Sequence, residues 1–309
     1  MQLDFSSEPG SNLPACSDGT RLLVVGCGYL GKRVALQHTA TVGPVWAITR
    51  SPEHAEEFAR QGLQPVLADV MCPETLDQLP EVDRVLFAVG FDRRAGHSIQ
   101  QVYQHGLANV LRRLPRSLRR LVYISSTGVY GQNAGEWVDE ASECRPIRAG
   151  GEACLAAERL IADSEFSGRA NCLRLAGIYG PGRIPYLREL REGLPLPVAD
   201  GCLNLIHVAD GVVAAMGALE CQVAPRTWNV ADGTPVLRRD YYRFVAAALQ
   251  APDPKFVDPD PAAEGRRVER AQSDKRVSNA RIRAELGITL RFPSFREGIL
   301  DSLGHIPFT

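Results

Sequence analysis

A glycine-rich turn near the start of the chain places the tightest limit on how the chain folds. Residues 24–31 read VVGCGYLG, after a short aliphatic segment at 21–25 and at the start of a helical pattern over 30–38. Gly26 permits a tight turn, Gly28 lets the backbone approach a phosphate, and Gly31 lets the helix pack closely on the strand. This order of strand, turn and helix predicts a dinucleotide-binding unit. A glycine-rich turn without a ligand is the alternative interpretation.

The start of such a helix offers free backbone amides and the positive end of the helix dipole, and both favour phosphate groups. We therefore expect the turn itself to contact the cofactor. The predicted contacts are Gly26, Cys27, Gly28, Tyr29, Leu30 and Gly31.

Short apolar runs alternate with helical patterns through the first half of the chain. Predicted strands cover 21–25, 45–49, 65–67, 85–89, 121–125 and 171–175, and predicted helices cover 30–38, 53–61, 99–114 and 152–163. This alternation is typical of a parallel sheet with helices on both faces. The sequence therefore predicts an α/β fold, a Rossmann-type doubly wound parallel sheet with a smaller C-terminal substrate lobe.

Three segments are expected along the chain. Residues 1–20, rich in Ser, Pro, Gly and Asp, form a loose leader, and residues 21–176 form the dinucleotide-binding Rossmann domain. Residues 177–309 form a smaller substrate-side lobe, partly interleaved with the sheet. In this lobe we expect helices at 209–220, 239–250 and 276–286, and a Pro- and Asp-rich loop at 252–265.

Composition excludes several classes of partner. The formal net charge of −1 gives no basic excess that would draw the chain to nucleic acid or to an anionic membrane. No apolar run approaches the ~18 residues of a membrane span, and no signal peptide is visible. The 8 cysteines are scattered without metal-ligand spacing. We therefore expect a cytoplasmic protein with reduced thiols, no metal site and a small-molecule substrate.

The end of the second predicted strand bears on the choice of cofactor. NAD sites place a carboxylate there for the ribose hydroxyls, whereas this chain has Thr49, Arg50 and Ser51. An arginine at this corner suits the 2′-phosphate of NADP, with help from the neighbouring hydroxyls. NADP is therefore the predicted cofactor. NAD, with Arg50 as an ordinary surface residue, is the alternative.

Further cofactor contacts are expected where other strands end. Asp69 follows the third strand, where it suits the adenine end of the cofactor, although a simple turn or helix-capping role is an equal alternative. The full set of these expected contacts is Asp69, Val70, Ala88, Val89, Gly90 and Ser125.

Four later motifs carry a family resemblance. Residues 123–131 read YISSTGVYG, residues 174–183 read RLAGIYGPGR, residues 204–210 read NLIHVAD and residues 228–230 read WNV. With the glycine turn, they resemble the extended short-chain dehydrogenase/reductase superfamily of the epimerase/dehydratase type, over about residues 21–303. The resemblance implies a substrate between the sheet and the lobe, hydride transfer to or from a sugar nucleotide or a similar carbonyl or hydroxyl compound, and a homodimer.

The resemblance also implies roles for single residues. Ser126, four residues before Tyr130, matches the family's catalytic Ser/Thr, whose hydroxyl holds the reacting oxygen as charge develops. A strand-end serine bonded to backbone is the alternative. Tyr130 is a second catalytic candidate, with a packing tyrosine as its alternative. Thr127, Arg183 and Asn204 are the expected substrate contacts.

One part of the family pattern is missing. The family uses a Tyr-x-x-x-Lys pair in which the lysine lowers the tyrosine pKa. If Glu158 marks the family's acidic residue, Gly150 and Cys154 occupy the tyrosine and lysine positions. The resemblance therefore favours an NADP(H)-dependent epimerase- or oxidoreductase-like enzyme with a non-standard active site. A non-catalytic NADP(H)-binding redox sensor or interaction protein is the alternative.

Overall fold

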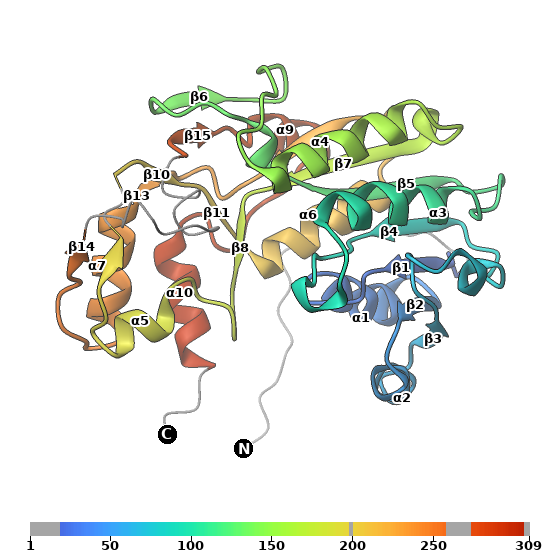
Figure 1. Cartoon of the computed structure of the whole chain (residues 1–309), viewed down its shortest axis with the longest axis horizontal. Coiled ribbons are helices and arrows are strands. Elements are labelled where there is room, and N and C mark those ends of the chain that lie inside the picture. Colours follow the sequence, from blue (N-terminus) through green and yellow to red (C-terminus); the bar gives the residue numbers. More distant parts are fainter. Residues whose placement is uncertain (1–18, 198–199, 258–272, 306–309) are drawn as a thin grey trace.

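A seven-stranded parallel sheet forms the centre of the molecule (Figure 1). The computed structural model describes residues 19–197, 200–257 and 273–305. The strand order is β12-β7-β5-β4-β1-β2-β3, and every neighbouring pair is parallel. This confirms the predicted doubly wound α/β fold. The strands are β1 (Leu22–Val25), β2 (Val45–Thr49), β3 (Gln64–Leu67), β4 (Arg84–Phe87), β5 (Arg120–Ser126), β7 (Ala170–Leu175) and β12 (Thr227–Val230).

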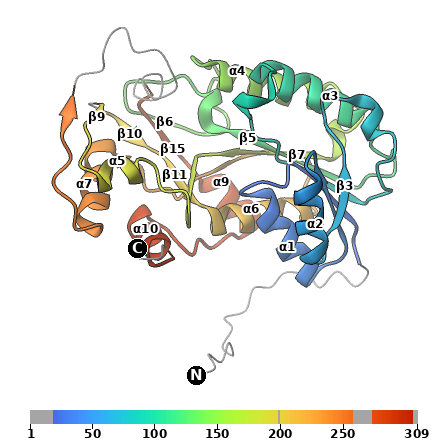
Figure 2. The same ribbon diagram turned by 60° about the horizontal axis from the view of Figure 1, so that its bottom comes forward.

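Helices cover both faces of the sheet because successive strand residues point in opposite directions. In β1, Leu22 and Val24 belong to one apolar cluster, and Leu23 and Val25 belong to another. Figure 2 shows the two helical layers above and below the strands. The first cluster includes residues of α1 (Gly31–Thr41), α2 (Pro52–Arg60) and α6 (Val208–Glu220), and the second includes residues of α3 (Gly106–Leu111) and α4 (Ala149–Ala162).

A smaller lobe lies beyond the ends of the strands and has its own apolar core. Tyr241, Tyr242 and Phe295 are among its buried residues. Within the described residues, the lobe contains short paired strands and helices. These are β8 (Gly177–Tyr179), α5 (Leu187–Arg191), β9 (Leu196–Pro197), β10 (Cys202–Leu203), β11 (Leu205–His207), β13 (Val236–Leu237), α7 (Arg238–Ala248), β14 (Phe256–Val257) and α10 (Phe295–Gly304).

Several element boundaries differ from the sequence prediction. The helix expected at 276–286 is instead a strand, β15 (Lys275–Val277), followed by α9 (Ala280–Leu286). β15 pairs in parallel with β6 (Glu136–Val138), so two segments far apart in the chain form a small separate sheet. Both strands are too short for their pairing to be read from periodicity. The helix expected at 99–114 contains a π-helical turn, Gln101–His105.

The leader expected at 1–20 lies mostly outside the described residues, as does most of the loop expected at 252–265. Within the described ranges, no helix is long and apolar enough to cross a membrane. The same ranges contain no group of three or more His, Cys, Asp or Glu side chains that suits a metal ion.

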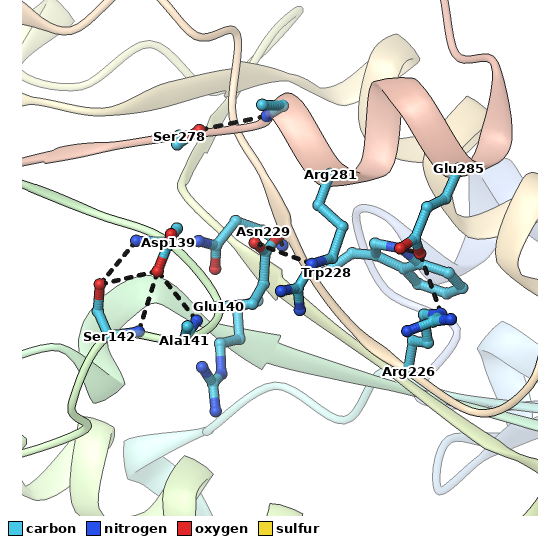
Figure 3. Close-up of polar contacts among 12 residues, drawn as sticks. Asp139, Glu140, Ala141, Ser142, Arg226, Trp228, Asn229, Ser278, Arg281 and Glu285 are labelled. Atoms are coloured by element: carbon cyan, nitrogen blue, oxygen red, sulfur yellow. Dashed lines mark hydrogen bonds and ion pairs between the residues drawn. The ribbon is translucent and has the colours of Figure 1, made fainter.

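The last strand of the sheet is held by side chains from distant segments (Figure 3). Trp228 Nε1 donates a hydrogen bond of 2.8 Å to Glu285 Oε2 on α9, and Arg226 Nε lies 3.2 Å from the same oxygen. The backbone N–H of Asn229 donates to Glu140 Oε1 at 2.7 Å. These contacts fasten both α9 and the loop after β6 to β12.

A buried histidine makes the stability of this fold depend on pH. His38 on α1 is fully buried, and its Nδ1 lies 3.2 Å from Gly43 O. Burial lowers the pKa of His38 to about 4. The unfolded chain takes up a proton near the ordinary histidine pKa of about 6.5, whereas the folded chain resists it until the pH is much lower. The stability linked to His38 is therefore present above that ordinary value and is lost as the pH falls below it.

We expect His38 to account for a loss of about 2 kcal/mol in the free energy of unfolding between about pH 7.5 and about pH 5. Urea unfolding of the native protein and of His38→Asn at both values measures this as the difference between their pH dependences. His105→Asn, at an exposed histidine, is the control and should unfold with the native pH dependence. A His38→Asn protein with the full native pH dependence would contradict the expectation.

Candidate functional site

A cavity of about 1230 Å³ lies at the carboxyl ends of the sheet strands and extends into the smaller lobe. Ligands of open parallel α/β sheets bind at this edge. The cavity wall includes the glycine turn, the ends of β2 and β5, and residues of the lobe. One continuous space therefore reaches both the predicted cofactor residues and the predicted substrate residues.

The three glycines of the turn differ in what surrounds them. A Cβ on Gly26 (φ +95°) would lie 2.5 Å from Ala88 C, and one on Gly31 would lie 2.3 Å from Gly26 O. A Cβ on Gly28 would meet no atom within 4 Å, and Gly28 lines the cavity. Gly26 and Gly31 are thus required by the packing of the protein itself, whereas Gly28 leaves space that a phosphate can enter.

Of the other residues of the turn, most line the cavity and one is buried behind it. Cys27, Tyr29 and Leu30 line the cavity together with Gly26, while Gly31 lies behind it at the start of α1. Tyr29 reaches across to the lobe, where its hydroxyl donates to Pro181 O at 3.1 Å. Burial raises the pKa of the Cys27 thiol to about 12, which keeps the thiol neutral.

The residues expected at the adenosine end of the cofactor also line the cavity, but they have protein partners. Arg50 Nη2 lies 3.2 Å from Asp92 Oδ2, and Arg50 Nη1 lies 3.9 Å from Asp69 Oδ2. Thr49 Oγ1 accepts from the Ser51 N–H, and Ser51 Oγ accepts from the His54 N–H at the start of α2. A 2′-phosphate would therefore compete with two carboxylates for Arg50.

The other expected cofactor contacts lie along the cavity wall between the strand ends. Ser125 is buried, and its hydroxyl donates to Glu158 Oε1 at 2.5 Å, so this hydroxyl has a protein partner. The remaining lining residues of this group are Val70, Ala88, Val89 and Gly90.

Ser126 lines the cavity at the end of β5, and its hydroxyl donates to no residue in the described part of the chain. Its Oγ accepts the Gly128 N–H at 3.0 Å and caps the short helical turn Thr127–Val129. This bond uses a lone pair of the oxygen and leaves the O–H to donate. Thr127 lies beside it on the cavity wall. The geometry suits a group that donates a hydrogen bond to a ligand oxygen.

Tyr130 does not reach the cavity. It is 1% exposed, its hydroxyl donates to Asn229 Oδ1 at 2.9 Å, and Arg174 Nη1 donates to the same hydroxyl at 2.9 Å. Burial raises the pKa of Tyr130 to about 12. The structure therefore assigns Tyr130 to packing and hydrogen bonding in the core, in place of the expected catalytic role.

Gly150 and Cys154 both line the cavity on α4. A Cβ on Gly150 would lie 3.6 Å from Ile99 Cδ1, which is ordinary contact, so this part of the wall has room for a small side chain. Burial raises the pKa of Cys154 to about 12, so its thiol carries no charge at neutral pH. Neither position supplies a phenol or a cation.

Two expected substrate residues of the lobe also line the cavity. Arg183 is exposed, and its guanidinium carbon lies 5.2 Å from the centre of the Tyr29 ring. Asn204 donates through Nδ2 to Lys275 O and accepts through Oδ1 from the Val277 N–H. Its side-chain amide is thus used to hold β15, and through β15 it positions Lys275.

Lys275 is a lining residue that no sequence pattern predicts, and the fold brings it to the cavity wall. Its side chain is buried, and Nζ donates to Tyr130 O at 2.9 Å and to Ser273 Oγ at 3.0 Å. Burial, and then repulsion by Arg148 and Arg238, lowers the pKa of Lys275 to about 8. No motif surrounds this lysine, and its place depends on the pairing of β15 with β6.

Comparison with known sequences identifies a family. A sequence model described as the NAD-dependent epimerase/dehydratase family matches residues 22–231. The Escherichia coli (strain K12) protein YeeZ is 25% identical over 285 residues, which cover 88% of this chain and 96% of YeeZ.

Several solved structures have a fold similar to that of this chain. A protein from Methylobacillus flagellatus described as an NAD-dependent epimerase/dehydratase is 28% identical, with a TM-score of 0.74 over 93% of this chain and 98% of that one. A functionally unknown conserved protein from Silicibacter pomeroyi is 26% identical, with a TM-score of 0.75 over 92% and 98%. The Bordetella bronchiseptica enzyme WbmG in complex with NAD is 18% identical, with a TM-score of 0.77 over 94% and 95%.

The different surroundings of Gly28 and Gly31 predict separate effects on binding and on stability. Gly31→Ala should lower the free energy of unfolding by about 1–3 kcal/mol, because its Cβ overlaps a backbone oxygen. Gly28→Ala should leave stability within about 0.5 kcal/mol of the native value and weaken dinucleotide binding about tenfold or more. Urea unfolding and isothermal titration calorimetry with NADP and NAD measure the two effects.

Gly168→Ala is the matched control, since a Cβ there also meets no atom within 4 Å and the residue lies outside the cavity lining. It should change neither measurement. Equal loss of cofactor affinity in Gly28→Ala and Gly168→Ala would remove the phosphate-binding role of the turn.

Proposed function

Because this chain belongs to the NAD-dependent epimerase/dehydratase family, we propose that it is an NADP(H)-dependent oxidoreductase or epimerase with a non-standard active site. Its substrate is a sugar nucleotide or a small carbonyl or hydroxyl compound. The bound nicotinamide supplies hydride transfer. NAD is the alternative cofactor.

One observation carries the proposal. The glycine turn, Arg50 and Ser126 share a single cavity with the lobe residues Arg183 and Asn204. A protein that only held a cofactor needs the first two of these. The extension of the same space from Ser126 into the lobe provides room for a second molecule beside the cofactor.

Different residues along this cavity bind the cofactor and the reacting oxygen. The open face of Gly28 and the N-terminal amides of α1 hold the cofactor phosphates, and Arg50 pairs with the 2′-phosphate. The Ser126 hydroxyl donates to the reacting oxygen and stabilises charge that develops there. The enclosed phenol of Tyr130 takes no part in proton transfer.

A non-catalytic, cofactor-binding protein is the second candidate. The observation that favours it is the absence of a phenol and a cation at Gly150 and Cys154, both on the cavity wall. Such a protein would distinguish oxidised from reduced cofactor without turnover. The homodimer expected from the family resemblance stays a prediction.

Loss of the Ser126 hydroxyl tests the catalytic proposal. Absorbance near 340 nm follows the oxidation or reduction of NADP(H) and NAD(H) with a panel of sugar nucleotides and small carbonyl compounds. Removal of a hydrogen-bond donor to a developing oxyanion costs about 100- to 1000-fold in kcat, so Ser126→Ala should lose at least about 100-fold.

Ser117→Ala, at an exposed serine outside the cavity, is the control and should retain native turnover. Unchanged turnover in Ser126→Ala would remove the assignment of Ser126. Cofactor binding without turnover across the panel would favour the second candidate, and a protein that binds neither cofactor would overturn both.

Arg50 tests the choice of cofactor. Arg50→Asp should weaken NADP binding by about tenfold or more and NAD binding much less, because only NADP loses a charge-assisted bond to its 2′-phosphate. Asp92→Asn should strengthen NADP binding, since it removes a carboxylate that lies 3.2 Å from Arg50. Calorimetric titration with both cofactors measures each dissociation constant.

Arg60→Asp, at an exposed arginine outside the cavity lining, makes the same change in net charge and is the control. It should affect both cofactors equally. Equal weakening of NADP and NAD in Arg50→Asp would count against NADP.

A further inference from the structure

Lys275 carries a buried amine on the wall of the cavity. The residue is 4% exposed, and its Nζ donates to Tyr130 O at 2.9 Å and to Ser273 Oγ at 3.0 Å. An ammonium group has three N–H donors, and the third has no acceptor among the described residues. No carboxylate in that part of the chain forms an ion pair with Lys275. One N–H of Lys275 therefore remains for a molecule in the cavity.

The contacts of Lys275 attach it to the same short segment as Ser126. Ser126 begins the helical turn Thr127–Val129, and Tyr130 ends it. Lys275 Nζ binds the carbonyl oxygen of Tyr130, and both Ser126 and Lys275 line the cavity. The fold therefore places a hydrogen-bond donor and an amine at opposite ends of one short turn.

Asn204 fixes the position of Lys275 from the side of the lobe. Its Nδ2 donates to Lys275 O at 2.8 Å, and its Oδ1 accepts the Val277 N–H at 2.7 Å. β15 is also held by its pairing with β6. Supporting bonds of this kind hold a reacting side chain in one geometry.

Hydride transfer to a carbonyl carbon also requires a proton for the carbonyl oxygen. Gly150 and Cys154 supply neither a phenol nor a cation, and the phenol of Tyr130 is enclosed in the core. Two histidines, His54 and His97, also line the cavity, and histidine is the commonest proton-transfer residue in enzymes. Within the described chain, neither histidine side chain is hydrogen-bonded to the turn that follows β5, whereas Lys275 is.

We propose that Lys275 is the proton-transfer residue of this cavity and exchanges its proton with the oxygen that Ser126 contacts. The inference rests on the proposed function and names the group that replaces the missing phenol. In reduction, the carbonyl carbon receives the hydride from the reduced nicotinamide, and the π electron pair of the C=O bond moves onto the oxygen. That oxygen takes a proton from the Lys275 ammonium, directly or through one water molecule, and the amine recovers a proton from solvent. Oxidation of the alcohol reverses these transfers.

The surroundings of Lys275 favour release of this proton. Burial, and then Arg148 and Arg238, lower the pKa of Lys275 to about 8, and proton transfer is most efficient when the pKa lies near the working pH. Both arginines have interaction partners of their own, and Asp274 attracts Arg238, so the inference rests on Lys275 alone. The other ionisable side chains on the strands packed against Lys275 are Glu136 on β6, Cys202 on β10 and Arg276 on β15 itself.

Direct titration of Lys275 tests the inference without turnover. The chain has three lysines, Lys32, Lys255 and Lys275, so ¹³C labelling of lysine at Cε gives three NMR signals whose shifts follow protonation. Lys275→Arg removes one signal and thereby assigns it. In protein saturated with NADP, we expect this signal to titrate near about pH 8. Titration near the ordinary lysine pKa of about 10.4 would overturn the inference.

The pH dependence of turnover is the second test. For a compound that the native protein reduces, kcat should fall as the pH rises through about 8, because the reaction uses the protonated amine. Lys275→Arg keeps the positive charge, but a guanidinium stays protonated throughout this range. It should lose about 100-fold in kcat together with the pH dependence, while NADP affinity stays native. If Lys275 acted only through its charge or its packing, arginine would retain most of the turnover.

Lys255→Met, at an exposed lysine outside the cavity lining, is the control and should keep the native kcat and pH profile. If Lys275→Arg no longer binds NADP, Lys275→Ala provides the same test, and added ethylamine should restore its turnover by supplying a free amine.

Two results would overturn the inference and leave the proposed function standing. One is a pH dependence of kcat that survives in Lys275→Arg, and the other is a pH dependence that His97→Asn removes instead. Cofactor binding without turnover of any compound would remove the proposed reaction and the role of Lys275 together, even where the Lys275 signal titrates near about pH 8.

Discussion

The buried ion pair between Glu158 and Arg174 determines how the wall of the cavity is assembled. Arg174 Nη2 lies 2.6 Å from Glu158 Oε2, with side chains only 9% and 10% exposed, and the pair joins α4 to β7. Burial opposes the charge on Arg174, but the hydrogen bonds and negative charge of Glu158 outweigh it and raise the Arg174 pKa. Ser125 donates to the same carboxylate, and Tyr130 accepts from Arg174. Loss of one partner of a buried pair typically costs about 3–5 kcal/mol, so α4 is held firmly against the sheet.

This network also determines which polar groups remain for a ligand. The hydroxyls of Ser125 and Tyr130 are hydrogen-bonded within this network, and the side-chain amide of Asn204 is hydrogen-bonded to β15. Ser126 keeps its hydroxyl proton, and Lys275 keeps an N–H without an acceptor in the described chain. The cavity wall therefore carries a neutral donor at Ser126 and a buried cation at Lys275.

Patterns within short stretches predicted most of the fold. The glycine turn and the alternating apolar runs indicated the parallel sheet and its carboxyl edge, and most of the residues predicted to contact a cofactor or substrate line the cavity there. Failures occurred where an element depends on a distant partner. The strand Lys275–Val277 forms because it pairs with Glu136–Val138, and neither three-residue run has a readable period.

By itself, the sequence determined the strand-turn-helix unit, since the positive φ of Gly26 and the close approach of Gly31 to the Gly26 carbonyl oxygen both lie within the turn. It also determined the position of Ser126 at the end of a strand. Only the tertiary structure decided which side chains face the cavity. Tyr130 is turned into the core by Asn229, Arg50 pairs with Asp92, and Lys275 enters the cavity wall. Each outcome depends on a contact between residues far apart in the chain, and such contacts leave no local pattern in the sequence.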